Sequence, residues 1–186
     1  ALGLFATLII GTIMEQAGAL IPGIVGDYIT FFGAVAKYMT GAGIGVGAAS
    51  KFKAGPLVTV SAATAGMAGA DASKILAGNF LISAGGVVFA ESGTSTGAVL
   101  MLSGFGEPLG AFIAAYVAIE LGLLVSGKTK VDIIVTPLVS ILSGSVVGLL
   151  IGPPISSFMS WLGGIVNYNV EQNPILGGII VSVLMG

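Results

Sequence analysis

The sequence predicts an all-α, polytopic integral membrane protein with about six membrane-embedded helical segments and a re-entrant or interfacial region. Three observations lead to this fold class. Of the 186 residues, 55% are hydrophobic and only 8% are charged, whereas soluble domains carry about 25% charge. The apolar residues form runs of roughly 20, the length that crosses a bilayer as a helix. The 31 glycines are typical of helices that pack closely in a membrane.

Five apolar runs are expected to be the main membrane segments. They are Leu2 to Ile21, Ile24 to Ala49, Pro56 to Ala70, Glu107 to Ser126 and Val131 to Ile151. Pro56 to Ala70 is a little short for a full crossing. The second run contains Gly41 to Gly47, where glycine stands at every second position; since glycine is a poor helix former, an irregular crossing is expected there. Pro137 lies inside the last run, where a membrane helix tolerates proline.

Two further stretches are less regular. Pro154 to Tyr168 is short and polar, and its aromatic residues Trp161 and Tyr168 favour a position at the membrane interface. Residues 72–106 carry many Gly, Ser and Thr residues. They fit either one helix with a re-entrant loop or a folded-back hairpin.

The ends of the chain suggest a single membrane domain, 1–186, that is the N-terminal part of a longer one. The final apolar stretch, Pro174 to Gly186, would be about 20 Å long as a helix, less than the roughly 30 Å of a hydrocarbon core. The chain also begins without Met, already inside an apolar run. A signal peptide is the alternative for the first run, because Ala17-Gly18-Ala19 resembles a cleavage site.

Composition excludes several functions. The chain has no Cys and no His, so no disulfide, thiolate site or zinc site of the usual kind is expected. Its net charge of −2 leaves no basic surface for nucleic acid. We expect no metal, no cofactor and no catalytic residue in this chain.

The lysines predict the orientation. Lys51 and Lys53 lie in one loop, and Lys128 and Lys130 in another. The positive-inside rule places both loops in the cytoplasm. Lys74 then falls on the outer side, in mild conflict with that rule.

Small residues four apart form two rows that are expected to pack helices together. One row is Gly110, Ala114, Ala118 and Gly122, and the other is Ser140, Gly144, Gly148 and Gly152. A third row of Gly3, Thr7 and Gly11 ends in Glu15, whose carboxylate is expected to reach water near the helix end.

Residues 122–129 read GLLVSGKT, which fits the phosphate-loop pattern. A working loop follows a strand, whereas this stretch ends an apolar run of spanning length. We therefore expect a glycine-ended helix followed by a basic cytoplasmic turn.

Glu120 is the main candidate for a binding residue. An acidic residue within a membrane span is expensive and marks a functional site by default. Tyr116 lies one turn away on the same face, opposite the row of small residues. The alternative is a Glu at the cytoplasmic interface that reaches Lys128 or Lys130.

Two further acidic residues, which could accept hydrogen bonds, lie where the apolar pattern is interrupted. They are Glu107 before Pro108 and Glu91 before Ser92-Gly93. Asn79, together with Ser83, Thr94 and Thr96, could also hydrogen-bond a hydroxylated solute. The alternative is an exposed outer loop.

The C-terminal third carries a family resemblance. Residues 133–155 read IIVTPLVSILSGSVVGLLIGPPI, then come Trp161-Leu162 and the stretch NPILGGII at 173–180. This order resembles the membrane IIC subunits of the bacterial sugar phosphotransferase system, especially the fructose-like branch. The chain as a whole looks closest to the IIC-like group that includes the putative perfringolysin regulator.

The resemblance implies a permease subunit that moves a sugar across the bacterial cytoplasmic (inner) membrane while IIB and IIA domains supply the phosphoryl group. It also implies a multi-pass homodimer in the lipid bilayer. A membrane-bound regulator that kept the fold without coupled transport is the alternative.

Overall fold

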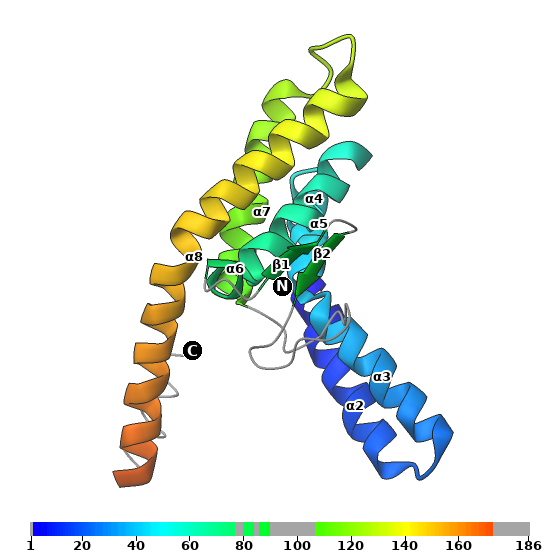
Figure 1. Ribbon diagram of the computed structural model, residues 1–186, viewed down its shortest axis with the longest axis vertical. Coiled ribbons are helices and arrows are strands. Elements are labelled where there is room, and N and C mark those ends of the chain that lie inside the picture. Colours follow the sequence, from blue (N-terminus) through cyan, green and yellow to red (C-terminus); the bar gives the residue numbers. More distant parts are fainter. Residues whose placement is uncertain (1, 77–79, 84–85, 90–106, 173–186) are drawn as a thin grey trace. The chain divides into compact units, whose positions relative to one another are not determined.

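The computed structural model describes residues 2–76, 80–83, 86–89 and 107–172, which are helical apart from one short strand pair and the turns (Figure 1). The all-α prediction is confirmed. The chain forms two compact units, Ala1–Gly152 and Pro153–Gly186. Whether residues 1–186 make up part of a longer domain stays a prediction.

The chain begins with a helical hairpin. Its first arm comprises α1 (Leu2–Leu4), a π-helical turn η1 (Phe5–Ile9) and α2 (Ile10–Leu20). The turn at Ile21–Gly23 starts the second arm, α3 (Ile24–Tyr38). Gly23 has a φ of 93°, a conformation that favours glycine. The first predicted run therefore ends where Pro22-Gly23 indicated.

The second predicted run is broken, but not where its glycines suggested. α3 and α4 (Thr40–Lys51) meet at Met39 with a bend of 54°. The irregular crossing expected at Gly41 to Gly47 is wrong, because these residues lie inside α4. The reason is packing: a Cβ on Gly41 would lie 2.7 Å from the carbonyl oxygen of Gly66. Glycine is needed there for close approach, which outweighs its low helix propensity.

The next segments are α5 (Pro56–Ala70) and α6 (Ala72–Leu76). Pro56 occupies the first turn of α5, where its missing N–H costs nothing. β1 (Phe80–Ser83) and β2 (Gly86–Phe89) form an antiparallel pair, with Phe80 opposite Phe89. The described parts of residues 72–106 are thus a short helix and a strand pair; whether the whole stretch is one helix with a re-entrant loop or a folded-back hairpin stays open.

Two helices complete the described chain. α7 (Pro108–Val125) matches the predicted run at Glu107 to Ser126, and α8 spans Asp132–Gln172. Pro137 lies within α8, as expected. Pro154 to Tyr168 does not form a helix of its own, because α8 continues through these residues; its position at the membrane interface stays a prediction. Pro174 to Gly186 lies outside the described residues.

Three helices in the described part of the chain are long and apolar enough to cross a membrane, or four if the bent pair α3–α4 is one span. The three are Leu2–Leu20, Pro108–Val125 and the Asp132–Gly164 part of α8. α5 is apolar but shorter. The expected number of about six embedded segments stays a prediction.

Both predicted rows of small residues are buried, and they face each other. A Cβ on Gly144 of α8 would lie 2.6 Å from the carbonyl oxygen of Ala114 and 2.7 Å from the Cβ of Ala118, both on α7. The same Cβ would lie 2.7 Å from Ala65 of α5. The prediction that these rows pack helices is therefore confirmed. Ile119 is the largest side chain that the resulting core buries completely.

Gly144→Ala should destabilise the bundle, because no neighbour at Gly144 is a flexible side-chain end that can move away. Overpacking typically costs about 1–3 kcal/mol, which exceeds the gain of about 1 kcal/mol from the better helix propensity of alanine. Thermal unfolding in detergent measures the effect. Gly163→Ala on the same helix is the matched control, since a Cβ there meets nothing within 4 Å, and it should leave the melting temperature unchanged or raised. Equal effects of the two substitutions would contradict the packing argument.

Candidate functional site

Polar groups gather where α5 ends and α7 begins. The backbone N–H of Glu107 donates to the carbonyl oxygen of Ala70 at 2.8 Å, which fixes the start of α7 beside the end of α5. The Ser73 hydroxyl donates to Oε1 of Glu107 at 3.2 Å. Asp71, between these two contacts in sequence, is only 9% exposed. This end of the bundle therefore holds two carboxylates, of which sequence reasoning singled out only Glu107.

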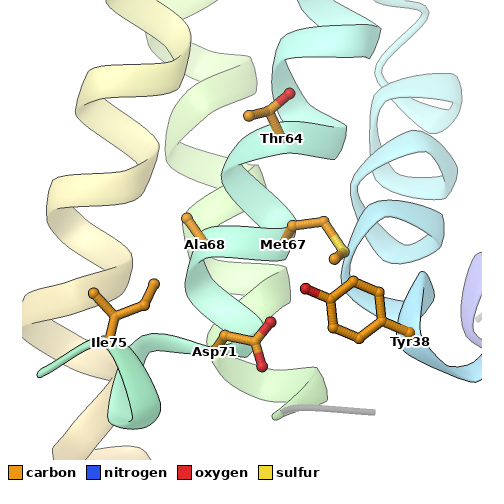
Figure 2. A pocket seen from close by; sticks show the side chains of 6 residues that line it. All are labelled: Tyr38, Thr64, Met67, Ala68, Asp71 and Ile75. Carbon is orange, nitrogen blue, oxygen red and sulfur yellow. The ribbon is translucent and has the colours of Figure 1, made fainter. Parts of the chain in front are cut away.

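A pocket of about 260 Å³ lies at the same end, bounded by α3, α5 and α6 (Figure 2). In Figure 2 the phenol oxygen of Tyr38 and the carboxylate of Asp71 are both turned into the space between α3 and α5. Thr64 adds a hydroxyl, and the remaining lining residues are apolar: Met67, Ala68 and Ile75. A single carboxylate in a mostly apolar concavity is a common arrangement for orienting a small polar ligand.

Sequence reasoning did not identify this pocket. Asp71 directly follows the apolar run that forms α5. An acidic residue at this helix end was the one feature of the sequence that could have indicated the pocket. Tyr38 lies 33 residues earlier and gave no signal, because a tyrosine inside an apolar run is ordinary. The two side chains come together because α4, which follows Tyr38 in the chain, packs against α5.

Glu120 and Tyr116 lie at a different level of α7. Glu120 is thirteen residues from Glu107, about 20 Å along a helix, so one sugar cannot contact both carboxylates. Glu120 is partly exposed, and no ion pair joins it to Lys128 or Lys130 in the described chain. The Tyr116 ring packs on Phe112 and Phe52, with centroids 6.3 and 5.6 Å away.

The remaining predicted residues fall elsewhere. Asn79, Glu91, Thr94 and Thr96 lie outside the described residues, and Ser83 ends β1. Their contacts with a solute stay predictions.

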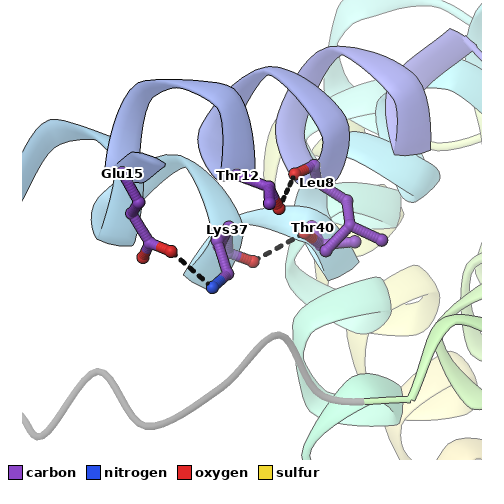
Figure 3. Close-up of polar contacts among 5 residues, drawn as sticks. All are labelled: Leu8, Thr12, Glu15, Lys37 and Thr40. Atoms are coloured by element: carbon purple, nitrogen blue, oxygen red, sulfur yellow. Dashed lines mark hydrogen bonds and ion pairs between the residues drawn. The ribbon is translucent and has the colours of Figure 1, made fainter. Parts of the chain in front are cut away.

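Glu15 is not the water-exposed carboxylate that the sequence suggested. Its Oε2 accepts from Nζ of Lys37 at 2.7 Å, across the α2–α3 hairpin (Figure 3). The two side chains are only 21% and 24% exposed. Glycines make room for them: a Cβ on Gly11 would lie 2.8 Å from Cγ of Lys37, and one on Gly33 would lie 2.8 Å from Cγ of Glu15. The pair is therefore built into the helix contact.

The stretch that fits the phosphate-loop pattern forms the end of α7 and the turn that follows it. Gly122 to Val125 complete α7, and the backbone N–H of Gly127 donates to Oδ1 of Asp132 at 2.8 Å. The same carboxylate oxygen accepts from the Thr136 hydroxyl at 2.6 Å. The turn thus binds a carboxylate of its own chain, at the start of α8, and α7 ends before a basic turn as expected.

No group of three or more acidic, His or Cys side chains suited to a metal ion occurs among the residues that the structure describes. The described helices offer carboxylates and hydroxyls, which can hydrogen-bond a solute.

The whole chain, residues 1–186, matches the family described as phosphotransferase system, EIIC. Neither a curated protein nor a solved structure matches it. The family supports a sugar substrate, IIA and IIB partners, and a place in the membrane, and the long apolar helices agree with that place. The match covers every residue of the sequence. The chain therefore belongs to the EIIC family, the membrane components of sugar phosphotransferase systems.

Proposed function

We propose that this chain forms part of a multi-pass permease in the bacterial cytoplasmic membrane, which carries a sugar across while a phosphorylated IIB domain donates the phosphoryl group. The family match over the full chain is the observation that carries the proposal. The motif order at residues 133–180 favours the fructose-like branch, near the group of the putative perfringolysin regulator. A homodimer is expected from the same resemblance.

The packing of the helices supports the predicted orientation. α5 and α7 are antiparallel, since Gly69 lies against Gly110 and Val58 against Gly122. The loop before α5 and the turn after α7 are therefore at the same end of the bundle. These segments contain Lys51 and Lys53, and Lys128 and Lys130, respectively. We propose that this lysine end faces the cytoplasm, and that the end with Asp71 and Glu107 faces outward.

We further propose that Glu120, with Tyr116 beside it, contacts sugar on its way through the membrane. Glu120 makes no ion pair in the described chain, which weakens the alternative that it serves the neighbouring lysines. A carboxylate accepts hydrogen bonds from sugar hydroxyls, and charged acceptors make the stronger bonds. Glu107, Glu91 and Asn79 are proposed as contacts at other levels of the path.

The orientation is testable with single cysteines, since the chain has none of its own. Ser50→Cys and Thr129→Cys lie in exposed positions at the lysine end. An impermeant thiol reagent should label them only after the membrane is opened. Labelling of either position in intact cells would overturn the proposed orientation.

Transport is testable with the full-length protein in liposomes. External sugar should appear inside as sugar phosphate when phosphorylated IIB is enclosed, and much more slowly when IIB is omitted. Glu120→Gln should reduce the rate about 10- to 100-fold if the carboxylate accepts a hydrogen bond from sugar, because bonds to charged groups contribute about 1.5–3 kcal/mol.

Two comparisons keep this test specific. Asp27→Asn, an exposed acid on α3, is the matched control and should transport normally. Glu120→Leu should lose transport while its melting temperature stays or rises, because an apolar residue is better accommodated by lipid. Full transport by both Glu120 variants would remove this residue from the path. Intact binding of IIB without any sugar phosphate formed would favour a regulator.

A further inference from the structure

The pocket between Tyr38 and Asp71 lies at a discontinuity in the helices. Tyr38 is the last residue of α3, and α4 departs from it at 54°. Asp71 stands between the end of α5 and the start of α6, so it too follows a helix end. Irregular backbone at membrane depth is tolerated only where protein or a water-filled cavity lines it. Both breaks line the same pocket, and a cavity is one of the settings in which such backbone is tolerated.

The carboxylate of Asp71 decides what can fill this space. A lipid tail would leave a charged group facing hydrocarbon, which is costly. A carboxylate offers about four acceptor positions, so it can serve a bound molecule besides any contact within the chain. No basic side chain is among the lining residues. The pocket therefore suits a neutral molecule with hydroxyl donors and disfavours a phosphorylated one, whose charge Asp71 would repel.

The volume of the pocket and its apolar lining residues further restrict which ligands it can bind. The pocket volume of about 260 Å³ lies just below the roughly 300–1,000 Å³ of pockets for drug-sized ligands, so the pocket suits a ligand of one sugar ring rather than an extended oligosaccharide. The Tyr38 ring, Met67 and Ile75 supply apolar walls for the C–H faces of such a ring. The hydroxyls of Tyr38 and Thr64 add hydrogen-bonding groups around it.

We propose that this pocket is a subsite for one unphosphorylated monosaccharide, occupied at the end of the bundle opposite the lysines before the sugar passes further. The inference rests on the proposed permease function and deepens it. It assigns Asp71 as acceptor for sugar hydroxyls and Tyr38 as both wall and hydrogen-bonding group. The subsite also distinguishes the substrate from the product, because sugar binds there and sugar phosphate does not.

A single cysteine at Ala68 tests the proposal directly in purified full-length protein. Ala68→Cys places a thiol in the pocket wall. D-Glucose, D-fructose, D-mannose and N-acetyl-D-glucosamine are each tested for slowing the reaction of this thiol with a maleimide. At least one should slow it, whereas the 6-phosphates should not. Thr129→Cys, in the exposed turn at the lysine end, is the control whose labelling should not change.

Second substitutions in the Ala68→Cys protein identify the contacts. Asp71→Asn and Tyr38→Phe should each raise the concentration of sugar that is needed to protect the thiol. The increase should be about 10- to 100-fold for Asp71→Asn, which removes the charged acceptor. Asp27→Asn and Tyr28→Phe, both on α3 and outside the pocket, are matched controls and should preserve protection. Tyr38→Phe keeps the test decisive if Asp71→Asn fails to fold.

The outcomes separate this inference from the function on which it rests. Protection that survives both Asp71→Asn and Tyr38→Phe would place the sugar elsewhere. Protection by detergent or lipid, but by none of the sugars, would show that the pocket binds apolar molecules and would overturn the subsite. Normal phosphorylation-coupled uptake without protection would also overturn the subsite while leaving the permease intact. Protection without uptake would uphold the subsite and count against the permease alone.

Discussion

Contact between helix backbones is the constraint on which the rest of this structure depends. α4, α5, α7 and α8 approach so closely that glycine or alanine is required along each line of contact. At Gly69, for instance, a Cβ would lie 2.6 Å from the carbonyl oxygen of Gly110. Lipid provides no hydrophobic drive between helices, so close van der Waals contact has to hold them together. The large apolar side chains accordingly point outward, as Leu150 and Phe31 do, and the centre consists mainly of alanine.

This mode of packing also explains where polar chemistry can occur. Helices in backbone contact leave little room for large side chains along their length, so space opens mainly at helix ends and at breaks. Asp71, Tyr38 and Glu107 all stand at such places. Lys51, Lys53, Lys128 and Lys130 lie at the opposite end of the bundle. The buried residues along the line of contact between α7 and α8 are accordingly uncharged: Gly110, Ala114, Ala118 and Gly122 on α7, and Ser140, Gly144, Gly148 and Gly152 on α8.

Sequence reasoning recovered the helices well and the site less well, for physical reasons. Residues four apart must share a helix face, so the rows through Ala114 and Gly144 could be read directly as packing surfaces. Composition favoured an irregular segment at Gly41 to Gly47, because propensity describes an isolated helix and not one that needs close contact. The partner of Glu15 and the neighbour of Asp71 depend on how separate helices meet. Neither Lys37 nor Tyr38 could therefore be assigned from the spacing of residues along the chain.

The ion pair between Glu15 and Lys37 has a consequence for how the protein enters the bilayer. Each charge alone, on a helix emerging singly into lipid, would cost about 2.5–3.5 kcal/mol at the centre of a span. Paired at 2.7 Å, the two charges present a net charge of zero to the lipid. The first two helices are thus more easily released from the translocation machinery together than one at a time. The turn at Gly23 keeps the two arms adjacent in the chain, so the carboxylate and the ammonium group can meet as soon as both helices have formed.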